Sequence, residues 1–279
     1  MIDVSVVVPV GPSIDHLDEQ LLALANQETD RSYEVIVVDN VPAGRQFELP
    51  DERFRVVHAP ERQTAGYARN VGASHALADV ILFCDADDLV SNRWVEAMFR
   101  AGIDLDVFGG PIDERSLDPL PATETTERRL HLPTDFPLMP RFSGGNIGLR
   151  AEAFATLGGW DDAYRAAEDV DVSWRAQLAG LKVAFAPDAL VYVRRRATAR
   201  DAFSQGLGWG FAQPRLLRRY QHHGLRRPPL SDAVIDWMKL LMYVPAAAAS
   251  RRLRRNWAAL LGVRLGRVMG SLRWQRLLL

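Results

Sequence analysis

The chain has 279 residues, of which 48% are hydrophobic, so it can form one large domain or two modest ones around a sizeable core. Its single cysteine, Cys84, excludes an internal disulfide and favours a reducing compartment. Residues 1–193 hold 16 Lys+Arg against 32 Asp+Glu, whereas residues 194–279 hold 18 against 3, although the formal net charge is only −1. The basic part predicts contact with an anionic membrane, a nucleic acid or an acidic partner.

Strands and helices alternate in the first 84 residues. The β-branched run at residues 3–9 is typical of a strand buried on both faces. Apolar residues then recur at helical spacing from Ile14 to Leu24, which predicts a helix with Ser13 as a plausible cap. Further strands are predicted at 33–39, 54–58 and 80–84, with a helix at 65–77. This order predicts a Rossmann-like parallel sheet with right-handed crossovers.

Three carboxylates, Asp85, Asp87 and Asp88, follow directly on the strand that ends at Cys84. Ligands of open α/β sheets gather outside the carboxyl ends of strands, and hard oxygen ligands suit Mg²⁺ or Mn²⁺ carrying phosphates. The alternative is a solvated acidic turn in which Asp88 caps the next helix, near Asn92. Cys84 lies inside the strand, which favours packing over reactivity.

The remaining acidic part predicts a strand at 106–112 and a long loop at 113–140. Glycines in 142–150 and 158–162 indicate that backbone passes close to another group. Residues 166–179 have the period of a helix in which Asp171 and Arg175 are spaced for an ion pair. Asp169 shares its face of this helix with the small residues Ser173 and Ala176, which would leave room for another molecule. Short strands are expected at 181–185 and 189–193.

Helices are predicted in the basic part, one of them beginning at a Ser231 cap and ending at Pro245. Its apolar run, 240–249, is far short of the roughly 20 residues that cross a bilayer. Residues 231–279 mix leucine, tryptophan and arginine in an interfacial amphipathic pattern, and an ordinary helical subdomain or an oligomer contact is the alternative. The chain enters a strand within a few residues of its start, without a signal segment. We therefore expect a cytoplasmic protein, peripheral on the inner face of the membrane.

Seven ordered segments between residues 3 and 193 resemble those of a family-2 glycosyltransferase with the GT-A fold: VVVPV, VVDN, AGYARNVGA, FCDADD, SGGNIGLR, GGWDD and AEDVDVSWRAQLAG. The resemblance implies an α/β GT-A domain at 1–193, a Rossmann-like, mainly parallel sheet flanked by helices. Its donor half would span about 1–112 and its acceptor half about 141–193. Residues 194–279 would then form a basic, amphipathic helical extension that contacts the membrane or a second copy.

The resemblance also implies inverting transfer of a sugar from a nucleotide-sugar donor to a hydroxyl of a glycan or lipid-linked acceptor. Asp169 would be the general base and Glu168 would orient it or bind the acceptor. A start-of-helix position predicts that Asp169 is ionised at neutral pH. The metal, Mg²⁺ or Mn²⁺, would be held by Asp87 and Asp85. Donor contacts are expected from Pro9, Val10, Asp39, Arg69, Asp85, Ala86 and Asp87, and sugar contacts from Gly145, Asn146 and Trp160.

Some of these assignments have alternatives. Asp39 also fits an ordinary aspartate turn, Arg69 also fits a surface arginine or one that orients Asp85, and Trp160 fits core packing as well as sugar stacking. Many relatives carry a metal-binding histidine where this chain has Val193, and Arg194, Arg195 and Arg196 are candidates for neutralising the diphosphate in its place.

Two other functions remain open. A nucleotidyltransferase also uses strand-end acids, but it needs a basic residue in an N-terminal glycine loop, and residues 10–13 lack one. The third class is a catalytically inactive relative that binds sugar nucleotides or, through its arginines, nucleic acid. We expect no nucleic-acid partner. The sequence does not reveal the sugar, the base of the donor, the acceptor or the oligomeric state.

Overall fold

A computed structural model describes residues 1–118 and 139–278, so most of the predicted loop at 113–140 lies outside the described residues. The described chain forms two compact units. The first consists of residues 1–117 and 139–194, and the second of Asp118 with residues 195–278.

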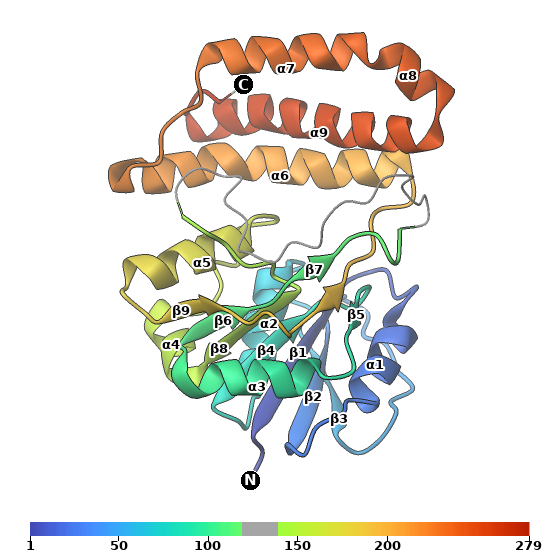
Figure 1. The fold of residues 1–279 in the computed structure, drawn as a ribbon, viewed down its shortest axis with the longest axis vertical. Coiled ribbons are helices and arrows are strands. Elements are labelled where there is room, and N and C mark those ends of the chain that lie inside the picture. Colours follow the sequence, from blue (N-terminus) through green and yellow to red (C-terminus); the bar gives the residue numbers. More distant parts are fainter. Residues whose placement is uncertain (119–138, 279) are drawn as a thin grey trace. The chain divides into compact units, whose positions relative to one another are not determined.

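A seven-stranded sheet forms the centre of the first unit, with strand order β3-β2-β1-β4-β8-β6-β9 (Figure 1). All neighbours are parallel except β8, which runs antiparallel to both β4 and β6. The strands are β1 (Val4–Val10), β2 (Tyr33–Asp39), β3 (Phe54–His58), β4 (Val80–Cys84), β6 (Val107–Gly109), β8 (Asn146–Arg150) and β9 (Val183–Phe185). The predicted mainly parallel α/β sheet is therefore confirmed.

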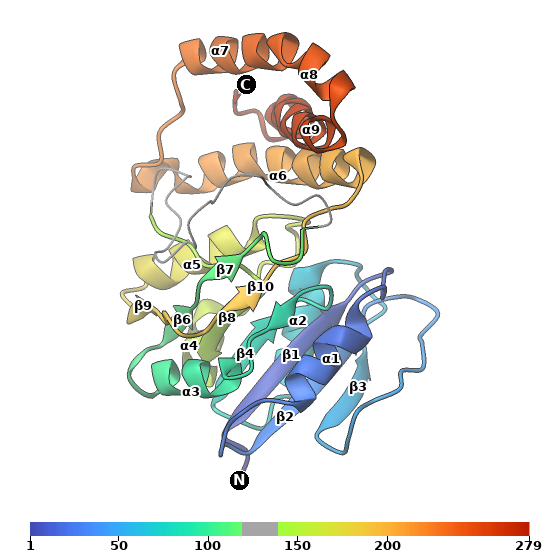
Figure 2. The same ribbon diagram turned by 45° about the vertical axis from the view of Figure 1, so that its right-hand side comes forward.

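Helices cover both faces of this sheet (Figures 1 and 2). Alternate valines of β1, from Val4 to Val10, pack with leucines of α1 (Leu17–Ala25) and with Met98 of α3 (Trp94–Asp104). Val7 points to the other face, where the apolar residues of three helices cover the sheet. These helices are α2 (Ala65–Ser74), α4 (Ala151–Leu157) and α5 (Glu168–Leu178). Because β1 is buried on both faces, its sequence is continuously apolar rather than alternating.

A second, three-stranded sheet joins β5 (Leu89–Val90), β10 (Val191–Tyr192) and β7 (Ile112–Asp113). The single strand predicted at 106–112 was wrong, since β6 and β7 belong to different sheets. Pro111 separates them and has no N–H to donate to a ladder, although its carbonyl accepts from Val191.

Three predicted helix boundaries were also wrong. The hydroxyl of Ser13 bonds to the carboxylate of Asp15 at 3.0 Å, and α1 begins only at Leu17. Ser231 lies inside α7 (Leu230–Met242), which starts directly after Pro229. Pro245 does not end that helix but belongs to the first turn of α8 (Val244–Ala249), where a missing N–H costs nothing.

The second unit consists of α6 (Ala199–Tyr220), the short 3₁₀ helix η1 (Gln221–His223), α7, α8 and α9 (Arg251–Trp274). In both views α6 and α9 lie alongside each other (Figures 1 and 2). Glycines repeat every four residues at the contact and bring the two backbones together: Gly206, Gly210, Gly262, Gly266 and Gly270. None of the helices in the described residues has both the length and the apolar content to cross a bilayer.

Candidate active site

The acidic turn after β4 is held in place by hydrogen bonds from a buried glutamine. Gln20 of α1 is fully buried, and its amide donates to the backbone carbonyl of Asp85 at 3.1 Å. The same amide accepts the N–H of Val90 at 3.1 Å. Both ends of the turn are therefore attached to α1, so Asp85 and Asp87 project from a rigid support. Cys84 is buried at the strand end, and burial raises the pKa of its thiol, which makes it unreactive.

Arg69 connects this turn to the start of α5. Its side chain is 2% exposed, and its two terminal nitrogens donate to Asp85 at 2.7 Å and to Glu168 at 2.8 Å. The guanidinium also lies 4.7 Å from the ring centroid of Trp160. Burial alone would lower the pKa of Arg69, but the carboxylates of Asp85 and Glu168 raise it. Arg69 is thus a permanently charged bridge between two acids that are 83 positions apart in the sequence.

The segment Gly144-Gly145 passes close to this bridge. A Cβ on Gly144 would lie 3.0 Å from Nη2 of Arg69, and one on Gly145 would lie 2.7 Å from Oδ2 of Asp85. Only a residue without a side chain leaves the ion pair undisturbed. The expectation that these glycines mark a close backbone approach is confirmed.

Glu168 and Asp169 form the first turn of α5. The preceding residue, Ala167, adopts a left-handed conformation with φ of 66°, which is uncommon for a residue other than glycine. Such backbone strain is found most often at functional sites. Oδ1 of Asp169 accepts the N–H of Val170 at 2.8 Å, and Oδ2 lies 3.7 Å from Nη1 of Arg141.

Burial raises the pKa of both acids. For Glu168, Arg69 opposes this shift while the neighbouring Asp169 adds to it. For Asp169, Arg141 and the backbone N–H groups of Val170 and Gly144 oppose the effect of burial. The expectation that the helix start alone keeps Asp169 ionised was therefore incomplete, because desolvation acts in the other direction. A carboxyl with a raised pKa is a better proton acceptor.

Asp39 is fully buried at the end of β2 and is engaged by Arg45. Oδ1 accepts from Nε and Nη2 of Arg45 at 2.9 and 2.6 Å, and Oδ2 accepts the Arg45 backbone N–H at 2.7 Å. Arg45 also donates to the carbonyls of Gly11 at 2.8 Å and Pro12 at 3.2 Å. Through Arg45, Asp39 at the end of β2 is therefore connected to the loop that follows Pro9 and Val10 of β1.

Two residues that were expected to face a sugar are buried in the protein. Asn146 is fully buried, accepts from Trp94 at 2.8 Å, and donates to the carbonyls of Pro111 and Ala189 at 2.9 and 2.8 Å. All its hydrogen-bonding groups have protein partners, so we exclude it from the sugar contacts. Trp160 is 2% exposed and packs edge-on to Phe83, as the core-packing alternative required.

The small residues beside Asp169 are also packed rather than open. Ser173 is fully buried, donates to the Asp169 carbonyl at 2.6 Å, and accepts the N–H of Phe142 at 3.1 Å. Ala176 is fully buried as well, so these two positions leave no room for a ligand, whereas Asp169 in the first turn is 8% exposed. The predicted ion pair on the same helix is confirmed, with Nε of Arg175 2.7 Å from Asp171.

Asp88 does not cap α3, which begins without a side-chain cap. Its Oδ1 accepts the backbone N–H of Arg194 at 2.9 Å, directly after Val193. The Arg194 guanidinium pairs with Glu19 of α1. The position where relatives carry a histidine is therefore anchored to the acidic turn through the backbone. Ala86, between Asp85 and Asp87, is 9% exposed and faces the core.

No group of three or more His, Cys, Asp and Glu side chains in the described residues is arranged to hold a metal. Two carboxylates nevertheless fit Mg²⁺ or Mn²⁺, because such ions are commonly held by one or two carboxylates and completed by substrate phosphates and water. Asp85 uses Oδ1 for Arg69, and its other oxygen faces the Gly145 backbone. The donor set of Asp85 and Asp87 therefore suits a metal that arrives with a phosphate-bearing ligand.

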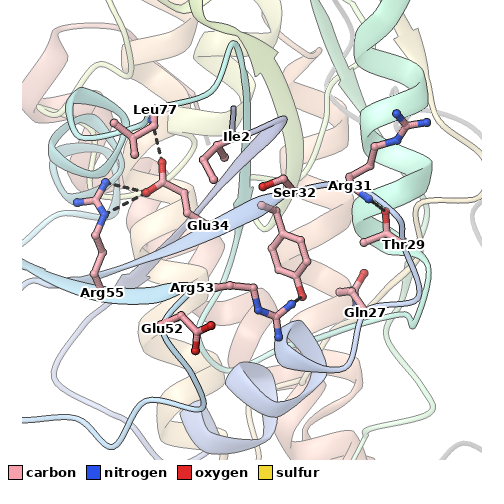
Figure 3. Close-up of a pocket in the computed structure, with 11 residues that line it drawn as sticks. Ile2, Gln27, Thr29, Arg31, Ser32, Glu34, Glu52, Arg53, Arg55 and Leu77 are labelled. Atoms are coloured by element: carbon pink, nitrogen blue, oxygen red, sulfur yellow. Dashed lines mark hydrogen bonds and ion pairs between the residues drawn. The ribbon is translucent and has the colours of Figure 1, made fainter.

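A separate pocket of about 490 Å³ lies at the amino ends of β1, β2 and β3, away from these acids (Figure 3). Arg55 pairs with Glu34 in it at 2.9 and 3.0 Å, and Glu34 accepts the N–H of Leu77 at 2.8 Å. Arg53 is paired with Asp51 and with the Tyr33 hydroxyl. Because its three arginines are already paired with carboxylates, this pocket is not the candidate active site.

Three site residues were missed from the sequence: Gln20, Arg45 and Arg141. Each acts on a candidate acid from a distant element or loop. Arg45 had a detectable signal, since a basic residue follows a strand-end acid after six positions. Gln20 and Arg141 carry no pattern of their own.

The arrangement of a β-strand acid cluster, a bridging arginine and a helix-start acid pair agrees with the family comparison. The model of glycosyl transferase family 2 matches residues 5–158, which is more than half of the chain. The chain belongs to glycosyl transferase family 2. A second model, glycosyl transferase family group 2, matches residues 130–266.

Individual relatives agree with this membership. The pre-mycofactocin glycosyltransferase of Mycobacterium tuberculosis is 27% identical over 282 aligned positions, which cover 91% of this chain and 57% of the relative. The putative glycosyltransferase EpsH of Bacillus subtilis is 32% identical over 36% of this chain and 30% of its own length. The chain thus spans little more than half of the first of these relatives.

A solved structure shows the same fold. GalNAc-T7, crystallised with UDP, GalNAc and Mn²⁺, superposes with a TM-score of 0.56 at 17% identity, over 70% of this chain and 44% of that chain. At this identity the similarity shows that the chain has the GT-A fold, and nothing beyond the fold.

Proposed function

We propose that this family-2 transferase moves a sugar from a nucleotide-sugar donor to an acceptor hydroxyl with inversion at the anomeric carbon. The observation that carries the proposal is the Arg69 bridge, which holds Asp85 of the strand-end cluster and Glu168 of the helix-start pair at 2.7 and 2.8 Å. The groups for leaving-group stabilisation and for proton transfer thereby meet at one site.

In this proposal Asp169 removes the proton of the acceptor hydroxyl as its oxygen attacks the anomeric carbon. The bond to the donor diphosphate breaks in the same displacement, and the proton remains on Asp169. Asp85 and Asp87 would hold Mg²⁺ or Mn²⁺, which when bound offsets the charge on the leaving diphosphate. Glu168 positions Arg69, and burial raises the pKa of the neighbouring Asp169. Because Gly145 has no side chain, the space beside Asp85 stays free for the donor.

Asp39 contributes to donor binding indirectly in this proposal. Both its oxygens are occupied by Arg45, so the donor base meets the Arg45 side chain and the Val10–Gly11 backbone before it reaches Asp39. The test of the function is a product assay with UDP-, GDP- and dTDP-sugars in the presence of Mn²⁺. Release of the nucleoside diphosphate from one of them supports the proposal, and the absence of release and of binding for all of them contradicts it.

Replacing Gly145 by alanine should weaken binding of the metal and donor together. The new Cβ would lie 2.7 Å from Oδ2 of Asp85, so the carboxylate must move. Overpacking of this kind costs about 1–3 kcal/mol, and we expect donor affinity in Mn²⁺ to fall about tenfold. Calorimetric titration of donor measures the effect. Gly66→Ala is the matched control, because the nearest atom to its Cβ is at an ordinary 3.4 Å.

Replacing Arg141 by glutamine should move the acid limb of the transfer-rate profile to higher pH. Asp169 acts as a base only when it is deprotonated, burial already raises its pKa, and Arg141 opposes that shift. Loss of the Arg141 charge therefore raises the pKa further, and activity is lost at a higher pH as the solution is acidified. The dependence of kcat on pH measures this, with the exposed Arg165→Gln as the control. An unchanged acid limb would show that Arg141 does not affect the pKa of the general base.

We also propose that the second unit contacts an anionic membrane surface peripherally, from the cytoplasmic side. Two features of the residues support this: the excess of 18 basic over 3 acidic groups in 194–279, and an apolar stripe on α7 that faces outward. Val234, Met238 and Leu241 of this stripe are 59%, 56% and 74% exposed. Cosedimentation with phosphatidylglycerol vesicles but not with phosphatidylcholine vesicles, lost in Met238→Glu/Leu241→Glu, is expected. Equal recovery with both vesicles would contradict the proposal.

A further inference from the structure

The second unit contains a cavity of about 230 Å³ between α7, α8 and α9. Its apolar wall consists of Leu240, Tyr243, Ala246, Leu253, Trp257 and Leu260. The wall is braced by the Trp257 indole N–H, which donates to the Leu240 carbonyl at 2.8 Å. The cavity is smaller than the roughly 300–1,000 Å³ of a pocket that encloses a whole drug-sized molecule. It is therefore suited to one part of a longer, mostly apolar ligand.

One wall of the cavity carries charge, from Arg264, Lys239 and Asp236. Arg264 pairs with Asp236 through Nη2. Its side chain is 11% exposed, and Nη1 is buried without a hydrogen-bond partner in the part of the chain that the structure describes. A buried N–H without an acceptor is unfavourable, and more so when the group is charged. With two cations and one acid, the cavity lacks an anion.

Three apolar residues of the cavity wall also reach the surface of the unit. Tyr243, Leu253 and Leu260 line the cavity and are also 60%, 46% and 52% exposed. Apolar surface therefore continues from the inside of the cavity to the outside of the unit. A hydrocarbon chain can follow this path, whereas a small hydrophilic anion would leave it uncovered.

We propose that this cavity binds a single molecule of an acidic lipid. An oxygen of its acid group accepts from Nη1 of Arg264, with Lys239 adding positive charge, and its hydrocarbon chain runs along Leu240, Trp257 and Leu260 to the exposed surface. The proposal specifies one lipid molecule rather than adsorption to a bilayer, and it does not depend on sugar transfer.

The test is calorimetric titration of the full chain with dodecanoate, below its micelle concentration, and with dodecan-1-ol. The two probes have the same chain length, so the difference reports the acid group. A charge-assisted hydrogen bond contributes about 1.5–3 kcal/mol, so dodecanoate should bind at least about tenfold more tightly. Arg264→Gln should abolish this preference while the alcohol still binds.

A second pair of variants does not touch the charged wall. Ala246→Phe places a ring in the cavity and should abolish binding of both probes. Ala248→Phe on the same helix points outward, since Ala248 is exposed, and should bind them as the natural protein does. Equal affinity for acid and alcohol, or unchanged binding in a folded Ala246→Phe, would overturn the proposal. If Arg264→Gln fails to fold, comparing Ala246→Phe with Ala248→Phe still tests whether the probes bind in this cavity.

Discussion

Asp169→Asn should lower the rate of sugar transfer by about 10²–10⁴-fold, the usual contribution of a general base, while donor affinity stays within about twofold. Asparagine has nearly the same shape but cannot take a proton. The Val170 N–H that bonds to Oδ1 of Asp169 at 2.8 Å still finds an acceptor in the amide, so the turn should persist. The expected pattern is a fall in kcat with little change in donor binding, measured by steady-state kinetics and calorimetry.

Two further variants make this result specific. Asp188→Asn removes an exposed acid from the same unit and should leave kcat unchanged. Glu168→Gln removes the negative charge opposite Arg69, whose Nη1 lies 2.8 Å from Oε1 of Glu168, and should weaken both donor binding and transfer because the bridge to Asp85 loosens. If Asp169→Asn retained more than about a tenth of the natural rate, the base would have to be another group.

Gly210→Ala should destabilise the second unit, although a Gly→Ala change inside a helix normally stabilises by roughly 0.5–1 kcal/mol. A Cβ at Gly210 would lie 2.0 Å from the carbonyl oxygen of Val263 in α9, and backbone cannot rotate away as a side chain can. The helices must separate, and overpacking of about 1–3 kcal/mol exceeds the propensity gain. Gly266→Ala, with its Cβ 2.3 Å from the Leu207 carbonyl oxygen, should act in the same direction.

Ser204→Ala is the matched control, because Ser204 is an exposed position of the same helix. Chemical denaturation followed by circular dichroism measures the difference in the free energy of unfolding. A stabilised Gly210→Ala would show that α6 and α9 do not meet through their glycines. The helical repeat of small residues is visible in the sequence, but it becomes interpretable only when two such helices are known to be paired.

Four strands of the sheet were predicted from the sequence nearly to the residue, because their cause is local. The β-branched and apolar runs at Tyr33–Asp39 and Val80–Cys84 favour a strand buried on both faces. The acids that follow these runs then had to lie at the carboxyl edge of the sheet. That geometry made Asp39, Asp85 and Asp87 candidates, whereas Arg69 and Asp169 were assigned from the family resemblance.

The errors have long-range causes. Residues 142–150 contain three glycines and were not predicted as a strand, yet Asn146–Arg150 is one because β4 and β6 offer hydrogen bonds on both sides. Gln20 and Arg141 act through partners 65 and 28 positions away, and nothing in their own neighbourhood selects those partners. Sequence patterns identify which acids carry chemistry better than they identify the residues that hold those acids.

The central claim is that the acids after β4 bind a nucleotide-sugar donor together with a divalent metal. The most direct measurement is the thermal unfolding midpoint of the natural chain and of Asp85→Asn/Asp87→Asn, with a panel of sugar nucleotides, with and without Mn²⁺. A ligand that binds the folded state raises this midpoint by mass action. We expect at least one sugar nucleotide to raise it only when Mn²⁺ is present and only in the natural chain. An equal rise in the double variant, or no rise with any donor, would contradict the account.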